Sequence, residues 1–289
     1  MRLTLPSAHR GAPSGAEITP VEPDPVRTGE GSAVVPRALT IAGSDSGGGA
    51  GIQADLKAFA AAGCFGTSAI VALTAQNTTG VTGVHEVPPA FVRSQLEAVF
   101  SDIGVDAAKT GMLFSAAVIE TVADVLGEQR VPLVVDPVMV ASSGARLLEA
   151  DAVQTLVTRL FPLATVVTPN LAEAEALAGP ASKRELAERL VELGAPAAIV
   201  TGGHGEPVDH LFDGERHLEI PVDRSDSGAT HGAGCTHSAT LAALLARGLS
   251  LEDAARGAAE TASGAVAQGL AEIGAGDGPV DVFGLRGAA

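Results

Sequence analysis

The chain has 289 residues, of which 34 are acidic and 18 are basic, so its formal net charge is −16. Such an acidic chain lacks the basic footprint that nucleic acids require, and a nucleic acid is therefore excluded from its expected partners. Hydrophobic residues make up 46% of the sequence but aromatic residues only 3%, so the core has to be built from aliphatic side chains, as in a layered α/β domain.

The first 36 residues are expected to form a disordered tail. Prolines alternate there with glycine, serine and acidic residues, and apolar residues show no period. The sequence contains neither the apolar stretch of a secretory signal nor a run long enough to span a membrane, so no membrane partner is expected. The two cysteines, Cys64 and Cys235, are accordingly expected to be reduced thiols of a cytoplasmic protein.

Residues 37–289 alternate between predicted strands and helices, without a linker that would divide them. Apolar runs such as Ser68–Leu73 and Leu133–Val135 are typical of strands that are buried on both faces of a parallel sheet. The other predicted strands are Ala38–Ala42, Ala107–Thr110, Thr165–Thr168, Ala198–Thr201 and a hairpin around Asp213 and Gly214; the predicted helices include Phe91–Ile103, Val118–Leu126, Leu171–Ala178, a helix capped by Ser182 and Glu185, Thr236–Arg247 and Leu251–Gln268. This order predicts one three-layer αβα sandwich with a mostly parallel central sheet.

Polar residues follow the predicted strands. In open parallel sheets ligands bind beyond the carboxyl ends of the strands, so these residues are expected to converge on one site. A carboxylate such as Asp136, which follows a buried strand, favours Mg²⁺ held largely through waters near phosphates, although Asp-Pro could also simply start a turn. Asn170 and Glu173 fit either nucleotide and metal contacts or the cap and first turn of a helix. The remaining members of this polar set are Asp45, Gln76, Lys109 and the Gly202-Gly203 turn.

Two glycine-rich segments carry the strongest chemical signal. The segment His231-Gly232-Ala233-Gly234-Cys235 opens a helix, so its free backbone N–H groups form a cradle for a phosphate or a developing oxyanion. Cys235 lies in the same turn, where the helix N-terminus is expected to lower the pKa of the thiol and favour a catalytic thiolate. The segment Gly43–Gly51 predicts a loop that lets a small substrate lie against bare backbone. Its spacing fits neither a dinucleotide fingerprint nor a P-loop. Together the two segments indicate phosphoryl transfer to a small molecule.

These motifs resemble the hydroxymethylpyrimidine/phosphomethylpyrimidine kinase family of thiamine biosynthesis, within the ribokinase-like superfamily. The resemblance runs from about Leu39 to Val280. It is carried by these segments in order: Ala42-Gly43-Ser44-Asp45, Gly51-Ile52-Gln53-Ala54-Asp55, Ala75-Gln76-Asn77-Thr78, Lys109-Thr110-Gly111-Met112, Val135-Asp136-Pro137, Thr168-Pro169-Asn170 with Glu173, Gly202-Gly203-His204, and His231-Gly232-Ala233-Gly234-Cys235.

The resemblance implies ATP and Mg²⁺ as cofactors and two successive phosphorylations. The first acts on 4-amino-5-hydroxymethyl-2-methylpyrimidine and the second on its monophosphate, so the expected partners are small molecules; a homodimer is also expected. The site residues that it implies are Gln76, Asp55, Met112, Gly43 and Ala50 for the pyrimidine, Gly232, Gly234 and Cys235 for catalysis, Asn170, Thr201 and Gly203 for ATP, and Asp136 and Glu173 for the metal.

One departure from the family pattern keeps alternatives open. Many members carry lysine before Gly-Gly-His, whereas this chain has Thr201, so the charge of the donor phosphates has to be met by Mg²⁺, by the helix that follows Cys235 or by another cation. The alternatives are a pyridoxal kinase on the same scaffold and a catalytically silent pyrimidine-binding or regulatory protein. An NAD-dependent oxidoreductase is a third and weaker alternative. Gln76 and Met112 favour the aminopyrimidine.

Overall fold

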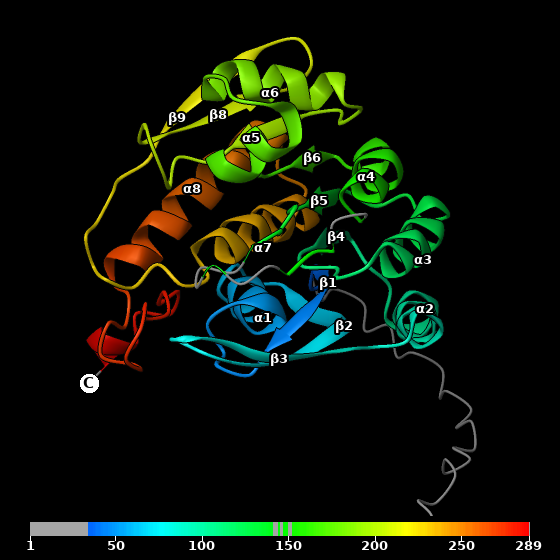
Figure 1. The fold of residues 1–289 in the computed structure, drawn as a ribbon, viewed down its shortest axis with the longest axis horizontal. Helices are drawn as coiled ribbons and strands as arrows, with labels where there is room; N and C mark the ends of the chain where they lie inside the picture. Colours follow the sequence, from blue (N-terminus) through cyan, green and yellow to red (C-terminus); the bar gives the residue numbers. More distant parts are fainter. Residues whose placement is uncertain (1–33, 141–143, 145–146, 150–151, 289) are drawn as a thin grey trace, which may run out of the picture. The chain divides into compact units, whose positions relative to one another are not determined.

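The computed structural model describes residues 34–140, 144, 147–149 and 152–288 (Figure 1). Val35–Ala289 form one compact unit. The tail expected over residues 1–36 lies almost entirely outside the described residues.

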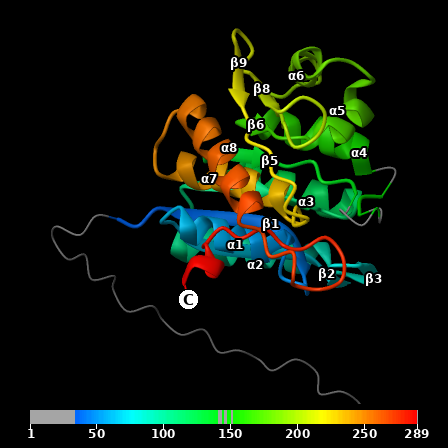
Figure 2. The same cartoon turned by 90° about the vertical axis from the view of Figure 1, so that its left-hand side faces the viewer.

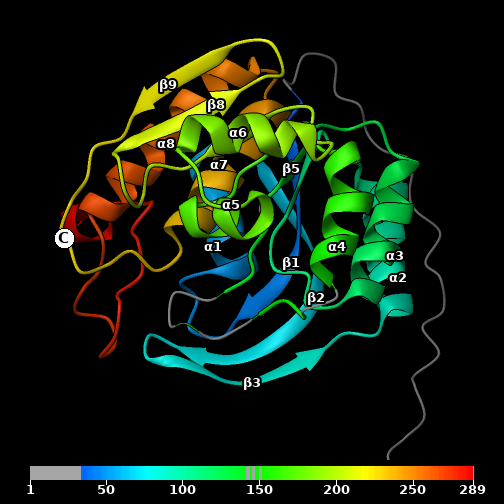
Figure 3. The same cartoon turned by 45° about the horizontal axis from the view of Figure 1, so that its top comes forward.

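Within the described residues, nine strands form one sheet in the order β3-β2-β1-β4-β5-β6-β7-β8-β9. The six central strands pair in parallel, whereas β3, β8 and β9 pair antiparallel with their neighbours. Strand β3 lies at one edge of the sheet and β8 and β9 lie at the other (Figure 3). The strands are β1 (Arg37–Asp45), β2 (Phe65–Asn77), β3 (Gly80–Glu86), β4 (Ala107–Thr110), β5 (Leu133–Val135), β6 (Val166–Val167), β7 (Ala198–Val200), β8 (Val208–Phe212) and β9 (His217–Pro221). The expected αβα class with a mostly parallel sheet is confirmed.

Helices cover both faces of this sheet (Figure 2). One layer consists of α1 (Gly51–Ala61), α7 (Ala233–Ala246) and α8 (Leu251–Ala267). The other contains α2 (Pro89–Ala98), α3 (Ala116–Gly127), α4 (Ala152–Thr155), α5 (Leu171–Ala178) and α6 (Lys183–Glu192). The strands serve both layers because successive side chains point to opposite faces. In β5, Leu133 and Val135 pack with the second layer, while Val134 packs against α7 and α8.

The expected helix Phe91–Ile103 is divided: α2 ends at Ala98, and Val99–Ile103 continue as a π-helical turn. Strand β3 was not expected from the sequence. Its residues are mostly exposed, and its two glycines leave little of the apolar alternation that marks a strand. Pairing with β2 supplies what the local sequence lacks.

Candidate active site

The polar residues that follow the central strands meet at one edge of the sheet, beside the start of α7. Asp45 ends β1, Lys109 lies in β4 and Asp136 directly follows β5. They come together because the strands run parallel and therefore end at the same side. Asn170 and Thr201 follow β6 and β7 farther along the same edge.

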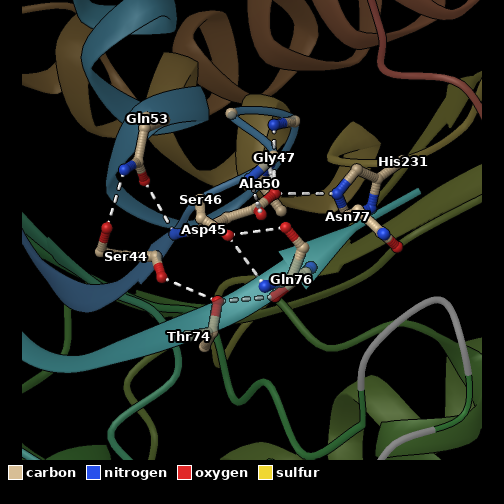
Figure 4. Close-up of polar contacts among 12 residues, drawn as sticks. Ser44, Asp45, Ser46, Gly47, Ala50, Gln53, Thr74, Gln76, Asn77 and His231 are labelled. Atoms are coloured by element: carbon tan, nitrogen blue, oxygen red, sulfur yellow. Dashed lines mark hydrogen bonds and ion pairs between the residues drawn. The ribbon is translucent and has the colours of Figure 1, made fainter. Parts of the chain in front are cut away.

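The carboxylate of Asp45 organises the first glycine-rich segment (Figure 4). Its Oδ1 accepts the backbone N–H of Gly47 at 2.7 Å, and its Oδ2 accepts those of Gly49 at 3.1 Å and Ala50 at 2.9 Å. The Nε2 of His231 lies 3.0 Å from the same Oδ2. Burial raises the pKa of Asp45, but the contacts with His231 and with the backbone of Gly47 and Ala50 outweigh it, so the pKa lies below its ordinary value. Asp45 is therefore an ionised carboxylate that accepts the backbone N–H groups of this loop and holds its conformation.

The two glycine-rich segments lie against each other. Gly232 has a φ of 86°, and a Cβ on this residue would collide with the carbonyl oxygen of Gly49. A Cβ on Gly49 would in turn collide with the ring of His231. Glycine is thus required at position 232 because the backbone of Gly49 approaches too closely for a side chain, and at position 49 because the ring of His231 occupies the space. The substrate loop and the helix cradle consequently form one surface.

Beneath this surface lies a buried charge cluster. The Nζ of Lys109 is 2.7 Å from Asp55 Oδ1 and 3.6 Å from Asp136 Oδ2, and the side chains of Lys109 and Asp55 are completely buried. Burial alone would lower the pKa of Lys109, but Asp55, Cys235 and Asp136 together raise it, so Lys109 is a cation. Asp136 also accepts a hydrogen bond from Ser238 on α7 at 2.7 Å. Lys109 and Ser238 were not assigned a role from the sequence.

Asp55, which was expected to contact the pyrimidine, is occupied inside this cluster. One oxygen faces Lys109, and the other accepts the hydroxyl of Thr40 at 2.6 Å. Burial raises its pKa against the opposing charge of Lys109. Its position was visible in the sequence, since Asp55 shares the buried face of α1 with Ile52 and Phe59. A direct contact between Asp55 and substrate stays a prediction.

The expected lowering of the Cys235 pKa is wrong. Burial of the thiol, with Asp55 and Asp136 adding to it, raises its pKa to about 12, although Lys109 and the backbone N–H of Gly51 act in the opposite direction. The helix N-terminus is local, whereas the two carboxylates come from other elements, and their effect together with desolvation is the larger one. Cys235 is thus a neutral thiol at neutral pH, hydrogen-bonded to the first residue of α1.

Asn170 and Glu173 form a capping box at the start of α5. Glu173 N donates to Asn170 Oδ1 at 3.0 Å, and Asn170 N donates to Glu173 Oε2 at 3.0 Å. The structural alternative considered for this pair is therefore realised. Burial and the nearby charge of Asp136 raise the pKa of Glu173 to about 8. Two acidic groups in close proximity fit one divalent cation, although no cluster of three or more potential metal ligands occurs among the described residues.

The expected nucleotide residues lie at the ends of β6 and β7. Thr201 N donates to the carbonyl of Pro169 at 3.1 Å, which joins the two strand ends, and Gly203 is exposed. Two residues that sequence reasoning did not single out hold the adjoining turn. Asp209 accepts a hydrogen bond from Gly202 N, and the Arg224 guanidinium donates to Gly202 O at 2.8 Å. Arg224 thus places a cation beside the turn that follows Thr201.

A cavity of about 320 Å³ opens beside the glycine loop. The expected pyrimidine residue Gln76 lines it, together with Asn77, Thr78, Thr79, His231, Gly276 and Asp277. Met112 and Gly43, which were also expected to contact the pyrimidine, are not among the residues that line this cavity, and they pack against each other. Gly43 N donates to Met112 O at 3.1 Å, and the side chain of Met112 fills the space where a Cβ on Gly43 would lie. Met112 and Gly43 are therefore in contact with each other, while the backbone N–H of Ala50 donates to the Asp45 carboxylate.

Solved structures share this architecture. The chain superposes on the pyridoxal kinase of Bacillus subtilis in its ADP complex with a TM-score of 0.80 and 38% identity, covering 88% of this chain and 99% of that one. A phosphomethylpyrimidine kinase from Clostridium difficile matches with a TM-score of 0.69 and 39% identity, covering 78% and 96%. The layered sheet and the glycine cradle at the start of α7 therefore define a small-molecule kinase with the ribokinase-like fold.

Sequence comparison narrows this class. Residues 45–281 match the family model described as Phosphomethylpyrimidine kinase, and the chain belongs to this family. It is 48% identical over 256 residues to a hydroxymethylpyrimidine/phosphomethylpyrimidine kinase of Rhizobium meliloti, covering 85% of this chain and 96% of the relative. Identity is 52% over 253 residues to a thiamine biosynthesis bifunctional protein of Geobacter sulfurreducens, of whose length the chain spans about half, 51%. None of the helices in the described ranges is long and apolar enough to cross a membrane.

Proposed function

We propose that this protein transfers a phosphoryl group from ATP to 4-amino-5-hydroxymethyl-2-methylpyrimidine and then to the resulting monophosphate. The family match and the names of its relatives support this reaction. The structural observation that carries it is the contact between the two glycine-rich segments. That contact sets the Cys235 thiol and the N-terminus of α7 directly beside the loop that would hold the acceptor.

For the pyrimidine, we infer that Gln76 recognises the amino edge of the ring. The hydroxyl of Thr74 lies 3.1 Å from Gln76 Oε1 and also 2.9 Å from Ser44 O. Because a hydroxyl has one proton, it cannot donate to both oxygens, and the amide of Gln76 remains available to pair with a substrate donor and acceptor. Met112, Gly43 and Ala50 would form the wall against which the ring lies, with Asp55 beneath it.

For phosphoryl transfer, we infer that the N–H groups around Gly232 and Gly234 receive the transferring phosphoryl group. The raised pKa of Cys235 fits a thiol that positions the attacking hydroxyl better than it fits a resting thiolate base. Such a role is adequate because phosphoryl transfer depends mainly on positioning and on stabilisation of phosphate charge. Lys109 contributes a fixed positive charge under this cradle.

Asn170, Thr201 and Gly203 are proposed to contact ATP, and Asp136 and Glu173 to hold Mg²⁺. When bound, Mg²⁺ supplies charge neutralisation for the donor phosphates. The paired carboxylates fit this ion because burial and their mutual repulsion, which together raise the pKa of Glu173, both disfavour two uncompensated negative charges, and a cation would compensate them. Since Thr201 carries no charge, Arg224 at the neighbouring Gly202 is proposed to supply a protein cation on this side.

We also propose that the protein is cytoplasmic and forms a homodimer. The free thiols Cys64 and Cys235 suit a reducing compartment. Strand β3 is an edge of the sheet, and the ribbon that it forms with β2 carries the exposed side chains of Leu73 and Val84. An open edge strand is a template for pairing with another chain. Light scattering on the eluting protein tests this state, and a monomer mass would contradict it.

Pyridoxal is the second candidate acceptor, because structures with TM-scores of 0.79 to 0.80 include pyridoxal kinases of Bacillus subtilis and Staphylococcus aureus. A coupled assay of ADP formation with the hydroxymethylpyrimidine, with pyridoxal and with no acceptor decides between them. We expect turnover with the pyrimidine to dominate. Higher kcat/KM for pyridoxal would reverse the assignment, and no turnover with either would support a silent binding protein.

The role of Cys235 is tested in the same assay. Cys235→Ala is expected to reduce kcat by about 10²-fold or more, because one contact with the reacting groups is lost. Cys64→Ala is the matched control: Cys64 is a buried free cysteine whose thiol donates to Ala243 O near the other end of α7, and its replacement should leave kcat unchanged. Full kcat in Cys235→Ala would show that this thiol is only packing.

A further inference from the structure

We propose that His231 is a positioning residue, which holds the phosphate cradle of α7 against the substrate loop through its contact with Asp45. The proposal rests on the proposed function. It assigns a task to a side chain that the scheme above places in contact with neither the reacting hydroxyl nor the transferred phosphoryl group.

Asp45 holds a fixed position in the substrate loop. This carboxylate is 3% exposed and accepts three backbone N–H groups of the loop that follows it. With those three bonds made, its Oδ2 cannot move without breaking the loop. His231 Nε2, 3.0 Å from that oxygen, therefore binds to a stationary partner (Figure 4).

His231 is held in position by its own backbone. Its backbone N donates to Gly278 O at 3.1 Å, and its backbone O accepts Val280 N at 3.1 Å. The carboxylate of Asp277 adds two bonds to the preceding residue, from Thr230 N at 2.8 Å and from Thr230 Oγ1 at 2.7 Å. The segment 277–280 thus clamps the backbone immediately before Gly232.

The two segments are connected by apolar packing and by hydrogen bonds. Apolar packing between α1 and α7 holds the two helices together, and the close approach of Gly49 to Gly232 and to the ring of His231 limits how near their starts can come. The exact placement of the two segments relative to each other depends on directional bonds. Between the segments these are the bond from His231 to Asp45 and the bond from Gly51 N to the thiol of Cys235. A thiol is a weak acceptor, so the His231 bond is the stronger of the two.

Loss of the bond between His231 and Asp45 should therefore let the separation between cradle and loop vary, while each segment keeps its own structure. Binding of the pyrimidine depends on the loop, which Asp45 still organises through its backbone bonds. Transfer depends on the placement of the cradle relative to the bound hydroxyl, and a misplacement of about 1 Å can cost about 10²-fold in rate. The His231 side chain also lines the cavity beside Gln76, so the expected signature is a fall in kcat that exceeds any change in the KM for the pyrimidine.

The experiment compares His231→Leu with His231→Gln and His231→Asn in the full chain, with thermal unfolding measured for each. The amide nitrogen of glutamine can occupy the place of Nε2 and donate to Asp45, whereas that of asparagine is too short to do so. His217→Leu is the matched control, since His217 Nε2 also faces a carboxylate, Glu188 Oε1 at 2.8 Å, but far from the cradle in the β9–α6 region.

We expect the leucine variant to lose about 10²-fold in kcat, the glutamine variant to recover most of it, and His217→Leu to match the wild type. Equal kcat in the wild type and the leucine variant would overturn the proposal. So would a series in which kcat follows thermal stability rather than the presence of a donor; if the leucine variant does not fold, the glutamine and asparagine variants make the same comparison. An inactive wild type would instead contradict the proposed function.

Discussion

Replacement of Lys109 by methionine tests the buried charge cluster beneath the site. The side chain of Lys109 is completely buried, as is that of Asp55, and Asp136 is 5% exposed. Methionine preserves much of the volume but leaves two carboxylates without their common cation. Removing one partner of a buried ion pair costs about 3–5 kcal/mol, because the remaining charge stays desolvated.

For a folded unit of this size, each kcal/mol corresponds to about 2–4 °C, so the unfolding temperature of Lys109→Met is expected to fall by about 6–20 °C. Urea unfolding followed by circular dichroism would measure the free energy directly. The stability of Lys109→Met is compared with that of the double variant Lys109→Met/Asp55→Asn. The double variant removes one of the two carboxylates that lost their cation, while asparagine can still accept the hydroxyl of Thr40. We expect it to regain more than half of the lost stability.

Two outcomes would refute this reasoning. A loss below about 1 kcal/mol in Lys109→Met would be typical of an exposed ion pair and would mean that the cluster is hydrated. A double variant that is no more stable than the single one would show that Asp55 is not the stranded charge. Asp55→Asn alone separates the roles of this residue, because a structural role lowers stability whereas a substrate contact raises the KM for the pyrimidine.

Three further substitutions address the ligand contacts. Gln76→Leu should raise the KM for the pyrimidine by the equivalent of about 1–3 kcal/mol and leave the KM for ATP unchanged, and an unaltered pyrimidine KM would remove Gln76 from the acceptor site. Glu173→Gln should raise the Mg²⁺ concentration for half-maximal activity by about tenfold or more, because it removes a proposed metal ligand. It should also lower stability, because the two carboxylate oxygens of Glu173 accept the backbone N–H groups of Asn170 and Met139 and glutamine keeps only one acceptor oxygen; an unchanged Mg²⁺ titration would contradict the metal assignment. Thr201→Lys should lower the KM for ATP and the dependence on Mg²⁺, and no change in either would place position 201 away from the nucleotide.

The central fold was predictable because its signals are local. The apolar run Leu133–Val135 coincides with β5, because such a run is typical of a strand buried on both faces of a parallel sheet. The predicted strand Ala107–Thr110 coincides with β4, although it contains Lys109. The helix Leu171–Ala178 was likewise found with its exact bounds. Strand β3 could not be found in this way, because its stability comes from its pairing with β2 rather than from its own residues.

The site was predictable as a location but less so as chemistry. Parallel strands bring their ends together whatever residues they carry, so the grouping of Asp45, Lys109 and Asp136 followed from topology. The bond from His231 to Asp45 joins residues 186 positions apart, and no local pattern indicates it. The predicted direction of the Cys235 pKa shift was wrong for a similar reason. Desolvation and two carboxylates that are distant in the sequence come together only in the folded chain, and their effect exceeds that of the helix N-terminus.

Helix α7 sets limits on how this site could change. Its 14 residues span about 21 Å, and those from Thr236 to Leu245 are buried against the sheet and the neighbouring helices. Ala239 and Ala242 are completely buried, so a larger side chain at either position would have no free space and would displace the helix together with the phosphate cradle at its N-terminus. Larger side chains near the C-terminal end of α7 are therefore expected to alter catalysis, as substitutions near the ligand do. A library designed to broaden acceptor choice would do better to leave α7 untouched and to diversify Thr79, whose exposed side chain borders the cavity. Asn77 should be kept, because its Oδ1 accepts the backbone N–H groups of Thr79 and Gly80 and so holds the turn between β2 and β3.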